Sequence, residues 1–136
     1  MLVVIRGGGD IATGIALRLH RSHMAVVICE LPAPTSIRRT VSFSEAMRLG
    51  ETAVEGVTAR RADLEEIPAL LERGEIPVLA DPAGDCIRRL APDAVVDAVL
   101  AKRNLGTTMD MAPAVVAAGP GFTAGTDCHA VVETMR

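Results

Sequence analysis

The sequence predicts an α/β protein with a doubly wound, mostly parallel sheet and helices on both faces. Three observations predict this fold class. Apolar runs that suit buried strands alternate with stretches that suit helices. Three consecutive glycines follow the first apolar run directly. The second run ends at Glu30, about 20 residues after those glycines, a spacing typical of nucleotide-binding βαβ units.

The first unit runs from the strand expected at residues 2–6 through a glycine-rich turn into a helix. Gly7, Gly9 and Ala12 fit the G-x-G-x-x-A form of the dinucleotide fingerprint. In such a Rossmann-like unit the backbone approaches a phosphate closely, and the following helix N-terminus favours its negative charge. We therefore predict that the turn binds the diphosphate of a nucleotide. The binding residues expected there are Gly7, Gly8, Gly9, Asp10, Ile11 and Ala12.

An alternative keeps the same fold without a ligand, with the glycines serving a tight turn and Ala12 serving close packing of helix on strand. Asp10 suits the N-cap position of the helix, although its charge would lie close to that of a diphosphate.

Glu30 stands where dinucleotide-binding proteins carry the acid that accepts a ribose hydroxyl. We expect the ribose to lack a 2′-phosphate, as in NAD, because no arginine follows Glu30 immediately. The alternative is a solvated glutamate at the end of a strand.

The composition limits the class of protein. The chain has 136 residues and a net charge of −3, which suits one domain with a core and argues against a nucleic-acid-binding surface. It has no apolar run long enough to span a membrane, and it begins directly with a strand rather than a signal peptide. Cysteines at positions 29, 86 and 128 are an odd, scattered set without a C-x-x-C pair, so we expect no disulfide framework and no metal site. A cytoplasmic protein is the interpretation that follows.

The rest of the chain continues the alternation. We expect a capping box at residues 42–45 before a short helix that ends near Gly50, and one strand at residues 52–60 that Gly56 weakens. A second capped helix at residues 63–73 precedes strands at residues 76–80, 94–100 and 114–118. We predict a single domain over residues 1–136, with residues 94–136 as a candidate for a following subdomain.

Three further segments are candidates for binding. Arg38 and Arg39 follow the second strand, and guanidinium groups bind phosphates and carboxylates bidentately. The glycine-rich loop with Gly119, Gly121 and Thr123 follows the last strong apolar run and is a candidate second binding loop. Residues 102–108 combine cations with a flexible, donor-rich loop and are a weaker phosphate candidate. Each segment has an alternative as surface charge or as a tight connection.

Cys128 and His129, with Glu133, are the potentially reactive cluster of the sequence. A histidine could lower the pKa of Cys128 and favour a thiolate. A structural role is the preferred interpretation, because the side chains of adjacent residues in a strand face opposite ways. No catalytic residue can be assigned, and whether the chain is an enzyme stays open.

Several blocks of the sequence resemble the YqeB-like proteins, a family of selenium-dependent molybdenum hydroxylase accessory proteins. The blocks are RGGGDIATG from Arg6, RRTVSF from Arg38, AKRNLGTT from Ala101, GPGFTAG from Gly119 and DCHAVVET from Asp127. The resemblance implies a maturation factor whose partner is a molybdenum hydroxylase apoenzyme. It also implies a longer protein, of which this chain would be the N-terminal part.

The fold and the resemblance together give a first hypothesis of a factor that binds a nucleotide-bearing cofactor, either NAD or a molybdopterin dinucleotide. A homo-oligomer is possible, and neither nucleic acid nor membrane is expected as a partner. A second hypothesis is an NAD-dependent oxidoreductase, because GGGDIA is also similar to the first unit of precorrin dehydrogenases. A third is a non-catalytic interaction module that has kept the fold and lost its ligand.

Overall fold

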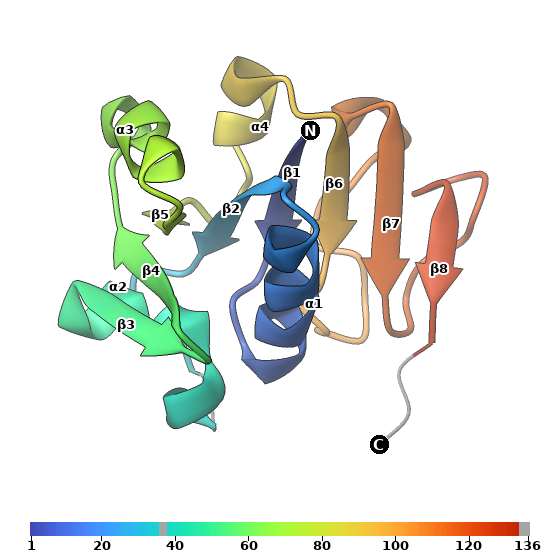
Figure 1. Ribbon diagram of the computed structural model, residues 1–136. Helices are drawn as coiled ribbons and strands as arrows, with labels where there is room; N and C mark the ends of the chain where they lie inside the picture. Colours follow the sequence, from blue (N-terminus) through green and yellow to red (C-terminus); the bar gives the residue numbers. More distant parts are fainter. Residues whose placement is uncertain (36–37, 134–136) are drawn as a thin grey trace.

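A computed structural model describes residues 1–35 and 38–133, and its centre is an eight-stranded sheet. The strands stand in the order β3-β4-β5-β2-β1-β6-β7-β8, from the green edge to the red edge in Figure 1. Every neighbouring pair is parallel except β3 and β4. The strands are β1 (Leu2–Arg6), β2 (Ala25–Glu30), β3 (Glu51–Val54), β4 (Val57–Arg61), β5 (Ile76–Ala80), β6 (Ala94–Asp97), β7 (Ala114–Ala118) and β8 (Ala130–Val132). The predicted mostly parallel sheet is confirmed.

Helices cover both faces of this sheet, as the sequence predicts. Helices α1 (Asp10–Arg21) and α2 (Ala46–Leu49) pack on the face that carries Val3, Ile5 and Ile28. Helices α3 (Ile67–Glu72) and α4 (Cys86–Leu90) pack on the opposite face, which carries Val4 and Val27. Short 3₁₀ turns η1 (Arg39–Val41), η2 (Phe43–Glu45), η3 (Leu64–Glu66) and η4 (Met109–Met111) complete the layers. Successive residues of β1 and β2 thus point to opposite cores.

The strand order places a switch point between β1 and β6. Numbered among themselves in chain order, β1, β2, β5, β6, β7 and β8 stand as 3-2-1-4-5-6, the order of dinucleotide-binding sheets. The chain leaves β1 toward β2 on one side and later returns to pair β6 with β1 on the other. Ligands of such sheets bind outside the carboxyl ends of the strands at this point. The glycine-rich turn after β1 lies there.

The single strand predicted for residues 52–60 is wrong. The segment is a hairpin of β3 and β4, in which Val54 pairs with Val57. Glu55 and Gly56 between them have φ values of 49° and 82°, which a two-residue hairpin turn requires. Gly56 therefore reverses the chain rather than weakening a strand.

Of the two predicted capping motifs, at residues 63 and 42–45, the first is confirmed and the second is wrong. The carboxylate of Glu66 accepts the N–H of Asp63 at 2.9 Å, so the capped start at residue 63 is confirmed. The capping box at residues 42–45 is wrong, because the hydroxyl of Ser42 donates to the carbonyl of Arg38 at 2.7 Å and caps no helix. The helix that follows does end at Gly50, whose φ is 90°.

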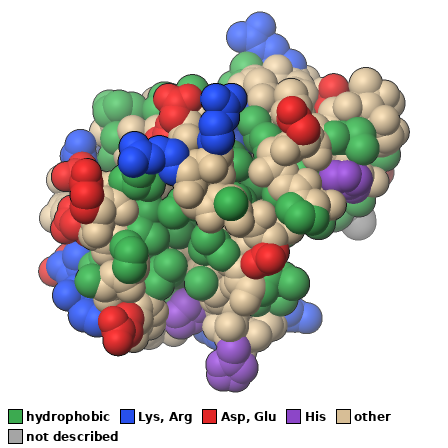
Figure 2. All heavy atoms as spheres, turned by 90° about the horizontal axis from the view of Figure 1, so that it is seen from above, with side chains coloured by type: hydrophobic (Ala, Val, Ile, Leu, Met, Phe, Trp, Pro, Cys, Tyr) green, Lys and Arg blue, Asp and Glu red, His purple; other side chains and the backbone are tan. Residues whose placement is uncertain are grey.

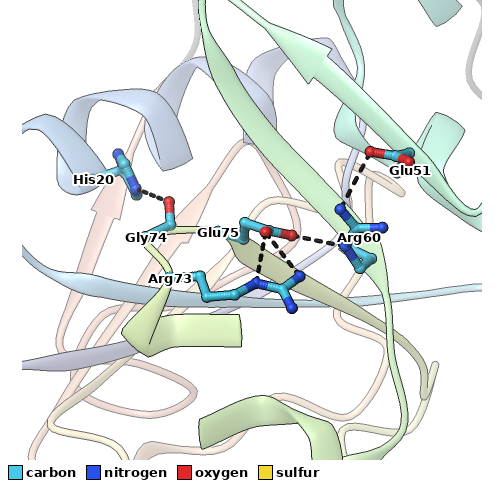
Figure 3. A network of polar contacts seen from close by, with 6 residues as sticks. All are labelled: His20, Glu51, Arg60, Arg73, Gly74 and Glu75. Atoms are coloured by element: carbon cyan, nitrogen blue, oxygen red, sulfur yellow. Dashed lines mark hydrogen bonds and ion pairs between the residues drawn. The ribbon is translucent and has the colours of Figure 1, made fainter. Parts of the chain in front are cut away.

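A surface network ties α1, the hairpin and β5 together (Figure 3). Arg60 donates to Glu75 at 2.7 Å, and Arg73 donates to the other carboxylate oxygen of Glu75 at 3.0 Å. Nε2 of His20 lies 2.8 Å from the carbonyl of Gly74. The hydrogen bond from Arg60 is the main cause that lowers the pKa of Glu75.

Figure 2 views the side on which β1, β6 and β7 begin, where hydrophobic side chains gather in the middle and charged ones lie around them. Within residues 1–35 and 38–133, no helix has both the length and the apolar character that crossing a bilayer requires.

Candidate functional site

The turn between β1 and α1 is built by close approach of backbone segments. Gly7 has a φ of 98°, and its N–H donates to the carbonyl of Cys29 at 2.8 Å. A Cβ at this position would lie 2.8 Å from the carbonyl oxygen of Ala98, which follows β6. Gly7 is therefore required by the packing of the turn against the end of β6, whether or not a ligand binds.

Glu30 lies against the same turn. One carboxylate oxygen accepts the N–H of Gly8 at 2.7 Å, and the other accepts the N–H of Leu31 at 2.8 Å. Each oxygen has two acceptor sites, so both keep a lone pair for a further donor such as a ribose hydroxyl. The structure thus brings together Gly8 and Glu30, which the sequence assigns to diphosphate and ribose.

The start of α1 differs from the sequence expectation. Gly9 is the N-cap residue, and Asp10 is the first residue of the helix, so the prediction of Asp10 as the N-cap is wrong. The carboxylate of Asp10 accepts the N–H of Ile11 at 2.9 Å. Its other oxygen lies 3.6 Å from Nη1 of Arg38, whose side chain is 70% exposed. The cation beside Asp10 offsets the charge that would otherwise oppose a diphosphate.

A covering segment, residues 42–45, closes one side of the turn. Ser44 donates its N–H to the carbonyl of Gly8 at 2.8 Å, and Phe43 donates its N–H to the hydroxyl of Thr13 at 2.8 Å. The side chain of Phe43 is fully buried among the core residues beside α1. Ala12 is buried in the same core, so it serves the close packing that the alternative interpretation assigns to it.

Arg39 lies beside the covering segment rather than on Asp10. It lines a cavity of about 190 Å³ with Ser44, Glu45, Arg48 and residues 32–34. The two adjacent arginines therefore occupy different surroundings, and the ion pair with Asp10 at the turn belongs to Arg38.

The predicted second loop stands two strands away from the first. Gly119, Gly121 and Thr123 follow β7, and β6 lies between β7 and β1. A Cβ on Gly121 would lie 2.5 Å from Cα of Arg103, and Thr123 donates its N–H to Asp127 at 2.9 Å. The segment at residues 98–103 contacts both this loop and Gly7, so it separates the two candidate sites.

A buried polar network fixes the loop at residues 104–107. The hydroxyl of Thr107 accepts a hydrogen bond from Nη1 of Arg6 at 2.6 Å and donates to Asp97 at 2.5 Å. Nη2 of Arg6 donates to the carbonyls of Pro82 and Leu105. Arg6 is 2% exposed, and its Nε has no hydrogen-bond partner among the described residues. Thr107 of the loop proposed for phosphate is therefore used inside the protein, whereas Lys102 and Arg103, the cations of that loop, are exposed.

Cys29 and Cys86 lie side by side, a contact that the sequence interpretation missed. Their Sγ atoms are 3.2 Å apart, and both side chains are buried. The hydrogen bond with Cys86, followed by burial, raises the pKa of the Cys29 thiol far above its ordinary value. Burial also acts to raise the pKa of Asp81 beside them, but N–H donors led by Cys86 outweigh it and the pKa is lowered. Spacing alone could not reveal this pair, because 57 residues separate the two cysteines.

The cluster at Cys128 is structural. Cys128 is fully buried in the core beneath β7, and burial raises the pKa of its thiol. His129 is exposed, and its Nδ1 accepts the N–H of Val115 at 2.9 Å. The two side chains face opposite ways, so the thiolate interpretation is wrong and the preferred structural one holds. Thr134 at the end of the DCHAVVET block lies outside the described residues.

Comparison with known proteins gives one informative relative. No family model matches the chain, and no solved structure matches it. The chain is 58% identical over 136 residues to the uncharacterized protein YqeB of Escherichia coli strain K12. The match covers 99% of this chain and 25% of that relative, so the chain spans a quarter of the length of the relative it matches. This comparison fits a YqeB-like protein, the family that the sequence blocks resemble.

Proposed function

We propose that the chain binds a nucleotide-bearing cofactor, NAD or a molybdopterin dinucleotide, at the turn between β1 and α1. The observation that carries the proposal is the hydrogen bond from Gly8 to Glu30 at the switch point of a 3-2-1-4-5-6 sheet. It places an acid with free lone pairs next to the N-terminus of a helix of 12 residues. A ribose and its diphosphate need those two features side by side.

Arg38 supports the same proposal. Its guanidinium stands over Asp10 at the helix start and is mostly exposed, so it can donate to a phosphate without leaving the carboxylate. In the longer protein this binding would serve the maturation of a selenium-dependent molybdenum hydroxylase, whose apoenzyme is the proposed partner. That wider role rests on the resemblance to the YqeB-like proteins.

Calorimetry on the full-length protein with NAD, NADP, ADP and a pterin dinucleotide tests the proposal. We expect binding of NAD or the pterin dinucleotide, and Gly9→Asp should weaken it at least about tenfold, because the new carboxylate lies where the diphosphate would. Gly9 has a φ of −70°, which any residue adopts. Gly14→Asp is the matched control, since Gly14 is exposed on the same helix with no atom near a Cβ.

Two results would remove the proposal. One is the absence of binding to all four ligands by folded protein. The other is an equal loss of affinity in Gly9→Asp and Gly14→Asp, which would make the effect one of overall charge.

The covering segment favours a second candidate, a non-catalytic interaction module. The N–H of Ser44 already donates a hydrogen bond to the carbonyl of Gly8, and a Cβ on Gly8 would lie 3.2 Å from the nitrogen of Ser44. On the side covered by residues 42–45, internal packing alone therefore accounts for the conformation of the turn. Retention of hydroxylase activation by a Gly9→Asp variant that binds no nucleotide would favour this candidate. Turnover of NAD with a tetrapyrrole would instead favour the precorrin-dehydrogenase alternative.

A further inference from the structure

Three potential metal ligands meet on the face of the sheet opposite α1. They are the Sγ atoms of Cys29 and Cys86 and a carboxylate oxygen of Asp81, all within 4.8 Å of one another. Cys29 comes from the end of β2, Asp81 follows β5 directly, and Cys86 is the first residue of α4. Because β2 and β5 are parallel neighbours, their carboxyl ends bring the first two ligands to the same edge.

The backbone holds the Asp81 carboxylate in position for a ligand. Oδ1 accepts the N–H of Asp85 at 2.9 Å, and Oδ2 accepts the N–H of Cys86 at 2.8 Å. Hydrogen bonds of this kind orient the ligands of metal sites. Oδ2 lies 3.9 Å from Sγ of Cys29 and keeps a second lone pair that the N–H of Cys86 does not use.

The surroundings also suit the charge of such a site. A divalent cation bound by two thiolates and one carboxylate carries one net negative charge. Arg6 is the register neighbour of Cys29 on β1, is almost fully buried, and has no carboxylate among its described hydrogen-bond partners. Arg6 is also the register neighbour of the buried Asp97 on β6 and shares the hydroxyl of Thr107 with it, so its positive charge would lie between Asp97 and the complex.

We propose that Cys29, Asp81 and Cys86 form a binding site for Zn²⁺. Two thiolate sulfurs and one carboxylate oxygen are ligands that Zn²⁺ accepts, and they leave one of four tetrahedral positions open. A cavity of about 300 Å³ is lined by both Asp81 and Cys86, with Leu64, Leu79 and Arg89 around it, so a water or a ligand can reach that position. Binding forms two Zn–S bonds and one Zn–O bond, and the two thiol protons pass to water.

The required adjustment is small. With Zn–S bonds of about 2.3 Å in tetrahedral geometry, the two sulfurs would stand about 3.8 Å apart. They now lie 3.2 Å apart, so a small rotation of one side chain suffices. The site is on the other face of the sheet from the nucleotide turn, and its test is independent of the proposed function.

Titration of the reduced, metal-free, full-length protein with Co²⁺ tests the site. We expect one equivalent to give an intense thiolate-to-cobalt charge-transfer band and the visible bands of tetrahedral cobalt, and Zn²⁺ to abolish both. Cys29→Ser and Cys86→Ser should each lose the band. Cys128→Ser is the matched control and should keep it, because Cys128 is an equally buried cysteine outside the cluster. Asp81→Asn should weaken cobalt binding at least about tenfold.

A second measurement keeps the test decisive if the serine variants do not fold. Zn²⁺ added to the wild-type protein should raise its melting temperature and protect Cys29 and Cys86 from alkylation, as mapped by mass spectrometry. The proposal is overturned if reduced wild-type protein gives no charge-transfer band. It is also overturned if the band survives Cys29→Ser, or if Zn²⁺ leaves both cysteines as reactive as before.

Discussion

The carboxylate of Glu30 accepts the main-chain N–H of Gly8 at 2.7 Å, at the carboxyl ends of the neighbouring parallel strands β1 and β2. The same side chain accepts the N–H of Leu31, so it joins the end of β2 to the glycine turn. Glu30 therefore has a structural task that is complete without a ligand, and it still keeps acceptor sites for one. The effects of substituting Glu30 on stability and on ligand binding can therefore be measured separately.

Glu30→Gln should lower the free energy of unfolding by about 1–2 kcal/mol, because an amide has one acceptor oxygen and cannot serve both N–H groups. Urea denaturation measures the change. Glu72→Gln, an exposed position on α3, should stay within about 0.5 kcal/mol of wild type. Equal effects in the two variants would show that the hydrogen bonds of Glu30 add nothing to stability.

Gly7→Ala should destabilise the fold by more than about 3 kcal/mol. The left-handed backbone costs an alanine about 1–2 kcal/mol, and its Cβ would also overlap the backbone of Ala98. Gly50→Ala is the matched control, since Gly50 has a φ of 90° with no atom within 4 Å of a Cβ. If thermal or chemical unfolding shows the same loss of stability for both variants, the close approach to Ala98 is not the reason why position 7 requires glycine.

Gly14→Ala should raise the free energy of unfolding by about 0.5–1 kcal/mol. Gly14 is exposed inside α1, and a Cβ there meets nothing, so alanine gains helix propensity without a clash. Chemical denaturation monitored by circular dichroism measures the gain. A loss of stability would mean that α1 is distorted at this turn.

Glu75 predicts a pH dependence of stability. Its pKa is lowered in the folded state, mainly by the hydrogen bond from Arg60. The carboxylate of Glu75 therefore binds a proton more readily in the unfolded chain than in the folded one. The stabilisation that Glu75 contributes is present above about pH 4.3 and is lost as the pH falls through the pKa of the folded state. Glu75→Gln should be less stable than wild type at pH 7, and the difference should shrink in acid.

Denaturation at pH 7 and pH 3 measures this difference. Glu55→Gln removes the exposed pair with Arg21 and is the control, with an expected change of at most about 1 kcal/mol. A difference between wild type and Glu75→Gln that is the same at both pH values would contradict the assignment.

The first βα unit could be predicted from sequence because its signals are local. The glycines, the apolar helix face and Glu30 lie within one stretch of chain, and β1, α1 and β2 form where expected. The hairpin was missed because Glu55 adopts a positive φ that a glutamate rarely takes. The capping box at Ser42 failed because the hydroxyl had a competing local acceptor in Arg38.

Which residues come together in the candidate sites depends on tertiary contacts, and the spacing of residues along the sequence does not reveal those contacts. Arg38 and Arg39 are adjacent in sequence, yet the structure places an ion pair to Asp10 on one and a proline-lined cavity around the other. Cys29 and Cys86 are 57 positions apart in the sequence, and their contact follows from the pairing of β2 with β5.

The position of β1 at the centre of the sheet has a consequence for how the chain folds. Leu2 donates its N–H to Asp93, 91 residues later, so the pairing of β1 with β6 closes a very long loop. Contacts of such separation are formed late and make folding slow. During synthesis the glycine turn and β2 can form early, while the far edge of β1 stays unpaired until β6 has emerged. Until then the unpaired edge of β1 can pair with a strand of another chain. Removing the hydrogen bond between Leu2 and Asp93 should lengthen the time for which this edge is exposed.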